Sequence, residues 1–327
     1  MSSIRYSTRG FASRTFKAEM SMKNPSLQDG AVEGLTAAET PFQRFVANYF
    51  ESRVATVAFF VLVVILILGF FAPLISPTDP YDLAQVDVLD SRLVPGSESY
   101  TGMTYWLGTD GAGRDLLSAI LYGLRTSLSV GVLSGLIALC IGGAVGLIAA
   151  YFGGKVETLI MRVVDIQLGF PAILVALVLV ALLGKGVDKI IIALVVVQWA
   201  YYARTVRGSA LVERRKEYIE AATCLALSHQ RIVFRHLLPN CLPPLIVVGT
   251  LQTAHAISLE ATLSFLGIGL PITEPSLGLL IANGFEYMLS QKYWISFFPG
   301  IALLITIISI NLVGDQLRDV LNPRLQK

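Results

Sequence analysis

Long apolar runs alternate with polar segments along the chain after residue 53. Three runs carry no charged residue, namely Val54–Ile75 over 22 residues, Thr126–Gly154 over 29 and Tyr293–Gly314 over 22. A helix rises about 1.5 Å per residue, so each run can cross a hydrocarbon layer about 30 Å thick. The pattern predicts a transmembrane helix in each run, and Pro73 and Pro77 mark the end of the first.

Three further spans are predicted in apolar segments that contain or adjoin charged residues. We place the third at about Val163–Gly184, the fourth at about Ile190–Arg207 and the fifth at about Pro244–Gly267. The fourth has an uncharged core of only 14 residues. It is therefore expected to tilt little, with Lys189 and Arg204 reaching to the interfaces at its ends.

Lys and Arg are unevenly distributed among the polar segments. Residues 1–53 and 204–240 each carry seven of them, whereas residues 77–125 carry seven acidic residues against three basic ones. Because cytoplasmic loops are enriched in Lys and Arg, both the N-terminus and the central segment 204–240 are predicted to lie in the cytoplasm. Six spans also place the C-terminus there, so the prediction is N-in and C-in.

The expected organisation has five parts. Residues 1–53 form a cytoplasmic tail that we expect to be partly disordered, with an interfacial helix over Pro41–Phe50 as the alternative. A first span over 54–76 and an extracytoplasmic loop over 77–125 follow, and residues Leu116–Leu124 of this loop predict an amphipathic helix at the membrane interface. The last two parts are a core over 126–314, which contains the polar segment 208–240, and a cytoplasmic tail over 315–327.

Composition agrees with an all-α integral membrane protein of six transmembrane helices. The chain is 54% hydrophobic and 15% charged, with a mean hydropathy of +0.66, whereas soluble domains have about 25% charged residues. A net charge of +2 gives no indication of a nucleic-acid partner. Cys140, Cys224 and Cys241 lack CxxC spacing, so a metal site or disulfide is not expected.

The polar segment contains the pattern of an amphipathic helix over Ala210–Leu227. Ala221, Ala222 and Ala226 are expected to keep one face thin enough to seat in a groove of another protein, with Glu217 and Glu220 pairing with basic groups there. The alternative is an ordinary basic loop that rests on anionic lipid. Pro239 is expected to end the following helix and redirect the chain into the membrane.

Ionisable residues within spans are functional candidates by default. Glu260, in the fifth span with His255, is a candidate for the translocation path; the alternative is a position near the interface, bonded to backbone. Asp165 is expected to form a local ion pair with Arg162, with a relay role as the alternative. His229 and His236 are expected to be solvated, outside any membrane site.

The sequence EYIEAATCLALSHQRIVFRHLLPN at 217–240 resembles the EAA loop of ABC-importer permeases. Glu220, Ala221 and Ala222 match its E-A-A, Ile232 its later isoleucine, and Leu238–Pro239 its L-P. Ala226 stands where the family commonly has glycine. The resemblance implies that the coupling loop, 208–240, contacts an ATPase, and the residues it implicates are Glu217, Tyr218, Glu220, Ala221, Ala222, Leu225, Ala226, Arg231 and Pro239.

Other stretches are similar to the second permease of dipeptide, oligopeptide and nickel ABC importers. They are LGTDGAGRDLLSAILYGLRTSL (107–128), YFGGKVETLIMRVVDIQLGFP (151–171), LEATLSFLGIG (259–269) and FPGIALLITIISINLVGDQLRDVLNPRL (298–325), and the likeness extends from about residue 42 to the C-terminus. It implies a type I permease fold with a cytoplasmic coupling helix, in the inner membrane of a bacterium, working by alternating access.

The resemblance also implies partners, which are a homologous second permease, two cytoplasmic ATPases and an extracytoplasmic substrate-binding protein. The chain has no GxxxxGK[ST] motif, so ATP and Mg²⁺ are expected on the ATPases, with no cofactor or catalytic role here. Peptides are the expected cargo, with nickel chelates and opine-like or sugar-linked compounds as alternatives. A secondary transporter would be expected to show inverted repeats, and a channel would need a selectivity filter or a ring of charged residues in its pore. A membrane enzyme would need a cluster of His, Asp or Glu at membrane depth. The sequence indicates none of these features.

Overall fold

The computed structural model describes residues 40–82, 86–100, 102–271 and 273–321. The predicted disorder of the N-terminal tail falls on residues outside this set, as does the end of the C-terminal tail. The chain divides into two units, Met1–Asn48 and Tyr49–Lys327. Helix α2 (Pro41–Glu51) begins in the first unit, at the position of the helix given as the alternative for Pro41–Phe50. All later elements belong to the second.

Two helices and a small loop region precede the core. Helix α3 (Arg53–Phe70) starts at Ser52, whose side chain accepts the N–H of Ala55, and α4 (Ala72–Ile75) follows directly. The loop region contains the 3-10 turn η2 (Val88–Asp90) and an antiparallel hairpin. Its strands are β1 (Ser97–Glu98) and β2 (Thr104–Tyr105).

Helix α5 (Leu116–Phe152) is one continuous helix of 37 residues. It begins at Asp115, whose carboxylate accepts the N–H of Ser118 at 2.8 Å. The predicted separate helix at the membrane interface is therefore wrong. Its apolar face instead packs in the first turns of α5, where Leu116 and Ala119 are fully buried among residues of α12 and α13.

The third span is bent rather than continuous, which corrects the prediction over 163–184. Helices α6 (Gly154–Gly169) and α7 (Ala172–Leu183) meet at 90°. Pro171 explains the break, because the residue before a proline is forced out of the helical region, and Phe170 is extended with φ −94° and ψ 142°. Five continuous helical stretches among the described residues are long and apolar enough to cross a membrane, or up to six if the bent pair is one span.

Helix α8 (Val187–Glu213) has 27 residues and is much longer than the predicted fourth span. It extends into the coupling loop as far as Glu213, and α9 (Glu217–Cys224) follows after a short turn. The single helix predicted over 210–227 is therefore two helices. A short α10 (His229–Arg231) and a π-helical segment η3 (Ile232–Leu237) come next.

Helix α11 (Leu238–Phe265) continues directly from η3, so Pro239 does not end a helix as predicted. A proline inside a helix removes one backbone donor, and the π-helical segment η3 ends at Leu237, just before Pro239. Pro243 and Pro244 also lie inside α11 without ending it. The chain closes with α12 (Leu277–Phe285), the 3-10 turn η4 (Met288–Ser290) and α13 (Trp294–Leu321).

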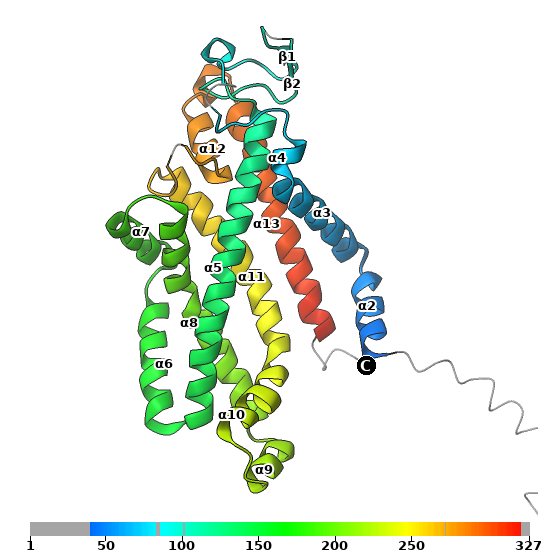
Figure 1. Ribbon diagram of the computed structural model, residues 1–327, viewed down its shortest axis with the longest axis vertical. Helices are drawn as coiled ribbons and strands as arrows, with labels where there is room; N and C mark the ends of the chain where they lie inside the picture. Colours follow the sequence, from blue (N-terminus) through cyan, green and yellow to red (C-terminus); the bar gives the residue numbers. More distant parts are fainter. Residues whose placement is uncertain (1–39, 83–85, 101, 272, 322–327) are drawn as a thin grey trace, which may run out of the picture. The chain divides into compact units, whose positions relative to one another are not determined.

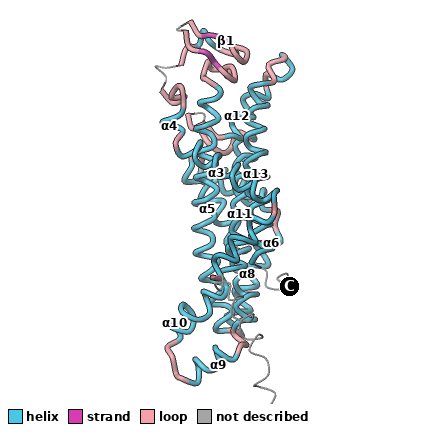
Figure 2. The backbone as a smooth tube through the Cα atoms, turned by 90° about the vertical axis from the view of Figure 1, so that its right-hand side faces the viewer, coloured by secondary structure: helices cyan, strands magenta, loops and turns pink. Residues whose placement is uncertain are grey.

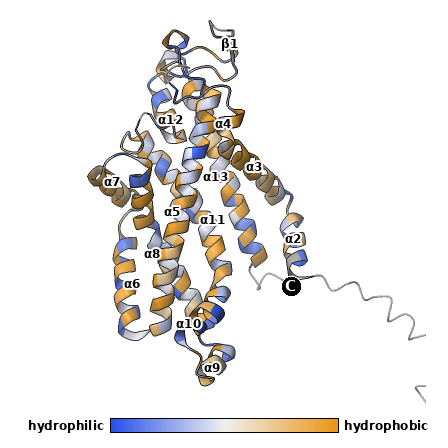
Figure 3. Cartoon of the chain, in the orientation of Figure 1, coloured by the Kyte–Doolittle hydropathy of each residue, from blue (hydrophilic) through white to orange (hydrophobic). Residues whose placement is uncertain are grey.

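Helix α5 is central in the second unit and packs against α3, α8, α11, α12 and α13 (Figure 1). Small residues allow its close approach to α8: a Cβ on Gly142 would lie 2.2 Å from the carbonyl oxygen of Trp199, and one on Gly146 would lie 2.3 Å from that of Ala203. Helices α3 and α7 are hydrophobic almost all round, as expected for surfaces that meet lipid (Figure 3).

The two polar regions lie at opposite ends of this unit. Figure 2 shows α9 and α10 at one end of the helices and the β1 hairpin at the other, and Figure 1 agrees from a second direction. This separation follows from the long helices of the unit, of which α5, with 37 residues, runs from the hairpin end to the corner beside α9 and α10 (Figure 1). The ends of these helices therefore decide where each polar segment lies.

Candidate coupling surface and membrane-depth sites

The inner face of α9 is anchored to the protein by a small apolar cluster. Ile219 and Ala222 of α9 are buried together with Ile232 of η3, and Tyr151 and Leu227 pack against them. Ala222 therefore contacts its own chain. Of the three alanines predicted to form a thin docking face, this one packs inward.

The outer face of α9 is acidic and exposed. Glu217, Glu220 and Ala221 are exposed, and Leu225 directly after the helix is 74% exposed. Carboxylates are repelled by anionic lipid headgroups, so this face is better suited to a protein surface than to a membrane. The predicted surface residues thus lie together, with an exposed leucine beside them.

Two hydrogen bonds attach α9 to the end of α8. The hydroxyl of Tyr218 donates to a carboxylate oxygen of Glu213 at 2.7 Å, and Lys216 forms an ion pair with the other oxygen, also at 2.7 Å. Burial, and then the Glu213 carboxylate, raise the pKa of Tyr218 to about 12. The tyrosine therefore keeps its proton at physiological pH and stays a donor to Glu213.

Two further contacts attach the coupling loop to the corner between α5 and α6. The Arg214 guanidinium donates to the carbonyl oxygen of Ala150 at 2.9 Å, which satisfies one of the open carbonyls at the end of α5. The Tyr151 hydroxyl and Nδ1 of His229 are 2.5 Å apart. His229, predicted to be merely solvated, is exposed but also connects α10 to α5. Sequence reasoning missed both contacts because each joins residues more than 60 positions apart.

Ion pairs join α6 to α8 just above this corner. Glu157 pairs with Arg207, and Asp165 pairs with Arg204. The predicted partner of Asp165 was Arg162, which lies on the same helix three residues earlier. The structure corrects this, because α8 runs beside α6 and brings Arg204 within reach of Asp165.

Ala226, the second residue after α9, adopts a left-handed conformation with φ +52° and is not part of a helix, contrary to the prediction. The N–H of Leu227 bonds to the carbonyl of Ala222 at 3.2 Å, and the N–H of Ala226 bonds to that of Thr223 at 2.9 Å. This pair of bonds is a Schellman motif, in which glycine is favoured at the left-handed position. The geometry gives a physical reason for glycine at the matching position of the resembled family.

The remaining coupling-loop residues are positioned by the helices that follow. Arg231 is exposed at the end of α10, and Pro239 lies in the first turn of α11. A π-helical segment lies between them, and such segments are often found at functional sites. The loop therefore enters the fifth span through irregular but unbroken helix.

Glu260 is fully buried and hydrogen-bonded to side chains. It therefore differs from the alternative given in the sequence analysis, which was a position near the membrane interface with bonds to the backbone. The hydroxyl of Ser127 on α5 donates to one carboxylate oxygen at 2.8 Å, and that of Ser264 donates to the other at 2.7 Å. The N–H of Leu277, at the start of α12, lies 3.5 Å from the Ser127 hydroxyl. Glu260 thus joins α11 to α5, and Ser127 in turn contacts the start of α12.

Comparison with protein families identifies the chain. Residues 40–95 match the N-terminal TM domain of oligopeptide transport permease C. Residues 142–327, more than half of the chain, match the binding-protein-dependent transport system inner membrane component. The chain belongs to this family. It is a multi-pass inner-membrane permease subunit, as its apolar helices independently indicate.

Curated relatives of this permease cover most of its length. The dipeptide transport system permease protein DppC of Escherichia coli (strain K12) is 39% identical over 88% of this chain and 95% of its own. The di/tripeptide transport system permease protein DppC of Pseudomonas aeruginosa (strain UCBPP-PA14) is 35% identical over 88% of this chain and 93% of its own.

Solved structures support the fold. The permease is similar to a chain of the MetNI methionine ABC transporter in an inward-facing conformation, with a TM-score of 0.52 and 20% identity. The match covers 62% of this chain and 96% of that one. At this identity the likeness shows the helical fold of an ABC-importer permease.

Proposed function

We propose that this permease subunit imports di- or oligopeptides across the cytoplasmic membrane and is driven by ATP through a contact at α9. The observation that carries the proposal is the exposed acidic face of α9, on a helix whose other face is anchored to α5, α8 and η3. A surface that has to receive force needs such a rigid attachment to the parts that move.

The proposal also assigns partner subunits to this permease. A homologous second permease completes the path, and two ATPases bind ATP and Mg²⁺ below it. A substrate-binding protein delivers cargo at the end that carries the β1 hairpin. This arrangement puts α9 and both termini in the cytoplasm, in agreement with the seven Lys and Arg residues of the coupling segment.

Coupling proceeds through the anchors of α9. When the ATPase pair closes, it displaces α9, and the bonds from Tyr218 and Lys216 to Glu213 pass the displacement to α8. The bond from Arg214 to Ala150 passes it to α5, and η3 passes it to α11. The permease then alternates between states that differ in these contacts, as a ligand-driven change requires.

Peptide cargo is supported by the names of the relatives and by the match to the oligopeptide permease domain. Nickel chelates and opine-like or sugar-linked compounds are the alternative cargo. Among the residues that the structure describes, no group of three or more His, Cys, Asp or Glu residues could hold a metal ion.

Charge reversal on α9 tests the coupling proposal. Glu217→Lys combined with Glu220→Lys should weaken co-purification of the ATPases and lower ATP-driven peptide uptake by roughly tenfold, because each reversal replaces an attractive contact with a repulsive one. Uptake into vesicles and the subunit composition of the purified complex are the measurements. The amount of permease in the membrane should not change, since both side chains are exposed.

Glu98→Lys is the matched control, since Glu98 is also exposed but lies on the β1 hairpin at the other end of the unit. It should leave ATPase association intact. Normal co-purification and normal uptake with both α9 glutamates reversed would reject the proposed contact. Uptake that is driven by an ion gradient without ATP would instead favour a secondary transporter.

A further inference from the structure

One face of α11 is left open by the helices around it. Thr253, Ile257 and Glu260 face α5, where Gly135, Gly131 and Ser127 lie against them. Ala256, Leu259 and Leu263 are buried in a cluster with α7 and α8, and Ala261 lies against Gly278 of α12. Helix α13 also packs on α11, since a Cβ on its Gly314 would lie 2.5 Å from the Thr250 hydroxyl and 3.6 Å from a Leu251 methyl group, and Val248 packs on a cluster of α5 and α8. The face that these contacts leave open carries His255, Ser258, Thr262 and Leu266.

The outer half of this open face is polar. His255 is exposed, and Ser258 and Thr262 are half-buried beside it. The two hydroxyls are satisfied inside the helix, since Ser258 donates to the carbonyl of Ala254 at 2.9 Å and Thr262 to that of Ser258 at 2.7 Å. Within the described part of the chain, no hydrogen bond reaches the His255 imidazole.

His255 lies at membrane depth. It precedes the end of α11 at Phe265 by ten residues, which is about 15 Å of helix. An imidazole at this depth is costly against lipid, and ionisable residues inside spans nearly always face a protein interior or a water-filled cavity. The open face of α11 is therefore expected to meet water or a partner subunit.

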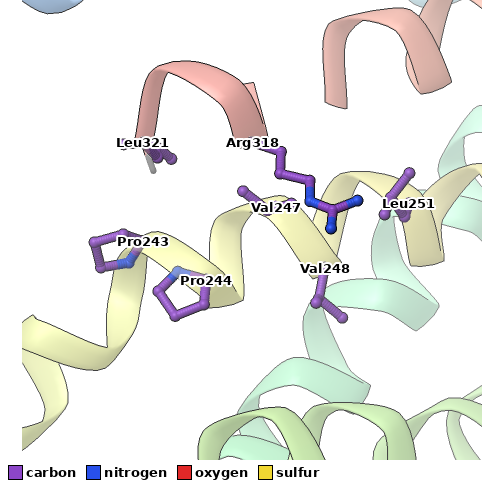
Figure 4. Close-up of a pocket in the computed structure, with 7 residues that line it drawn as sticks. All are labelled: Pro243, Pro244, Val247, Val248, Leu251, Arg318 and Leu321. Atoms are coloured by element: carbon purple, nitrogen blue, oxygen red, sulfur yellow. The ribbon is translucent and has the colours of Figure 1, made fainter. Parts of the chain in front are cut away.

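A cavity between α11 and α13 lies at the other end of α11. This cavity has a volume of about 440 Å³ and is lined by Pro243, Pro244, Val247, Val248, Leu251, Arg318 and Leu321. Figure 4 shows the Arg318 side chain of α13 reaching over α11 between Val247 and Leu251. Arg318 of α13 thus lies at the proposed cytoplasmic end of α11, and His255 lies nearer the middle of α11.

We propose that this face of α11 lines the translocation path and that His255 contacts the cargo, donating a hydrogen bond from its imidazole to carbonyl oxygens of the passing peptide. Every peptide carries this acceptor, so the contact suits a path that must accept many sequences. The proposal rests on the proposed function for the identity of the cargo. Glu260, the only residue assigned to the path from the sequence, is enclosed and forms part of the wall behind this face.

Cysteine accessibility in the complete importer tests the position of this face. Cys140, Cys224 and Cys241 are first replaced, and His255→Cys or Thr262→Cys is introduced. Both should react with a charged, water-soluble thiol reagent in membrane vesicles, and transported dipeptide should slow the reaction. Leu136→Cys is the matched control, since Leu136 is 53% exposed on α5 but in an apolar setting, and it should stay unmodified.

Substitution tests the role of the imidazole. His255→Leu should lower dipeptide uptake by about three- to tenfold, which is the effect of losing one hydrogen bond. His255→Gln keeps a hydrogen-bond donor and should retain most of the uptake. ATPase activity stimulated by the binding protein should persist in both variants, because α9 is unchanged. Equal loss in both variants, or no loss in either, would overturn the role of the donor.

The two proposals fail in different ways. If a transporting complex leaves His255→Cys unmodified in all nucleotide states, or cross-links it fully to the second permease, the path assignment is wrong and the function stands. If His255→Cys is modified but the complex moves no peptide, the open face is still a water-lined path and the proposed cargo is wrong.

Discussion

Ala226 shows how one backbone angle constrains the choice of residue in the coupling loop. A left-handed conformation costs an L-residue with a Cβ roughly 1–2 kcal/mol. Ala226 bears this cost because the Schellman bonds and the packing of Leu227 on α9 determine the turn. The strain lies directly beside the exposed face of α9 and so acts on the rigidity of the surface proposed to meet the ATPase.

Ala226→Gly should relieve this strain. The expected gain in stability is below about 1 kcal/mol, because glycine also loosens the unfolded chain. Hydrogen exchange at the amides of residues 225–228 should become slower, and the complex should melt at the same or a higher temperature. The control is Ala221→Gly in the interior of α9, which should cost about 0.5–1 kcal/mol. Faster exchange in Ala226→Gly would contradict the assigned backbone conformation.

A second pair of small residues tests the packing of α5. Gly142→Ala would place a methyl group 2.2 Å from the carbonyl oxygen of Trp199, so α5 and α8 must separate. Overpacking of this kind costs roughly 1–3 kcal/mol. The melting temperature of the purified complex should fall. Gly143→Ala is the neighbouring control, because its Cβ would meet no atom within 4 Å. Equal melting temperatures for the two variants would refute the close α5–α8 contact.

At the scale of the elements, the coupling loop is held by helix ends rather than by a core of its own. Glu213 at the end of α8 and Ala150 at the end of α5 receive bonds from Tyr218, Lys216 and Arg214. The Ala150 carbonyl is available because the last carbonyls of a helix have no partner within it, whereas Glu213 accepts both bonds through its side-chain carboxylate. The movement of α9 should therefore be transmitted to α5 and α8 together.

Arg214→Gln should weaken this transmission. The variant loses a charge-assisted bond to the end of α5, so uptake is expected to fall about three- to tenfold while the ATPases still co-purify. Transport per ATP hydrolysed is the measurement. Arg215→Gln is the control, since Arg215 is the next residue, is exposed, and makes no such bond. An unchanged transport ratio in Arg214→Gln would show that the α5 anchor does not carry the coupling.

At the scale of the whole molecule, the two polar ends must face opposite sides of the membrane. With Cys140, Cys224 and Cys241 replaced, Glu98→Cys on the β1 hairpin should react with an impermeant thiol reagent added outside intact cells. Arg215→Cys beside α9 should react only after the membrane is opened. Both residues are exposed, so access to water is matched. The reverse pattern of labelling would invert the N-in, C-in topology.

The membrane nature of the chain and its family could be predicted from local sequence, and local sequence also supplies the candidate coupling residues. Apolar runs such as Val54–Ile75 predict spans because helix length must match the bilayer, and this requirement needs no tertiary contact. The E-A-A of Glu220, Ala221 and Ala222 likewise lies in one short stretch. The family matches confirm the membrane character and the family that these stretches indicate, whereas the coupling role of the E-A-A residues stays a prediction.

Tertiary structure decided which face each of these residues presents and where each helix ends. Ala222 packs inward because η3 returns beside α9, and Glu260 is enclosed because α5 and the start of α12 close over it. Asp165 pairs across to α8 for the same reason. The left-handed turn at Ala226, the partners of Arg214 and the open face of α11 all depend on contacts between residues far apart in the chain, which hydrophobic periodicity does not record.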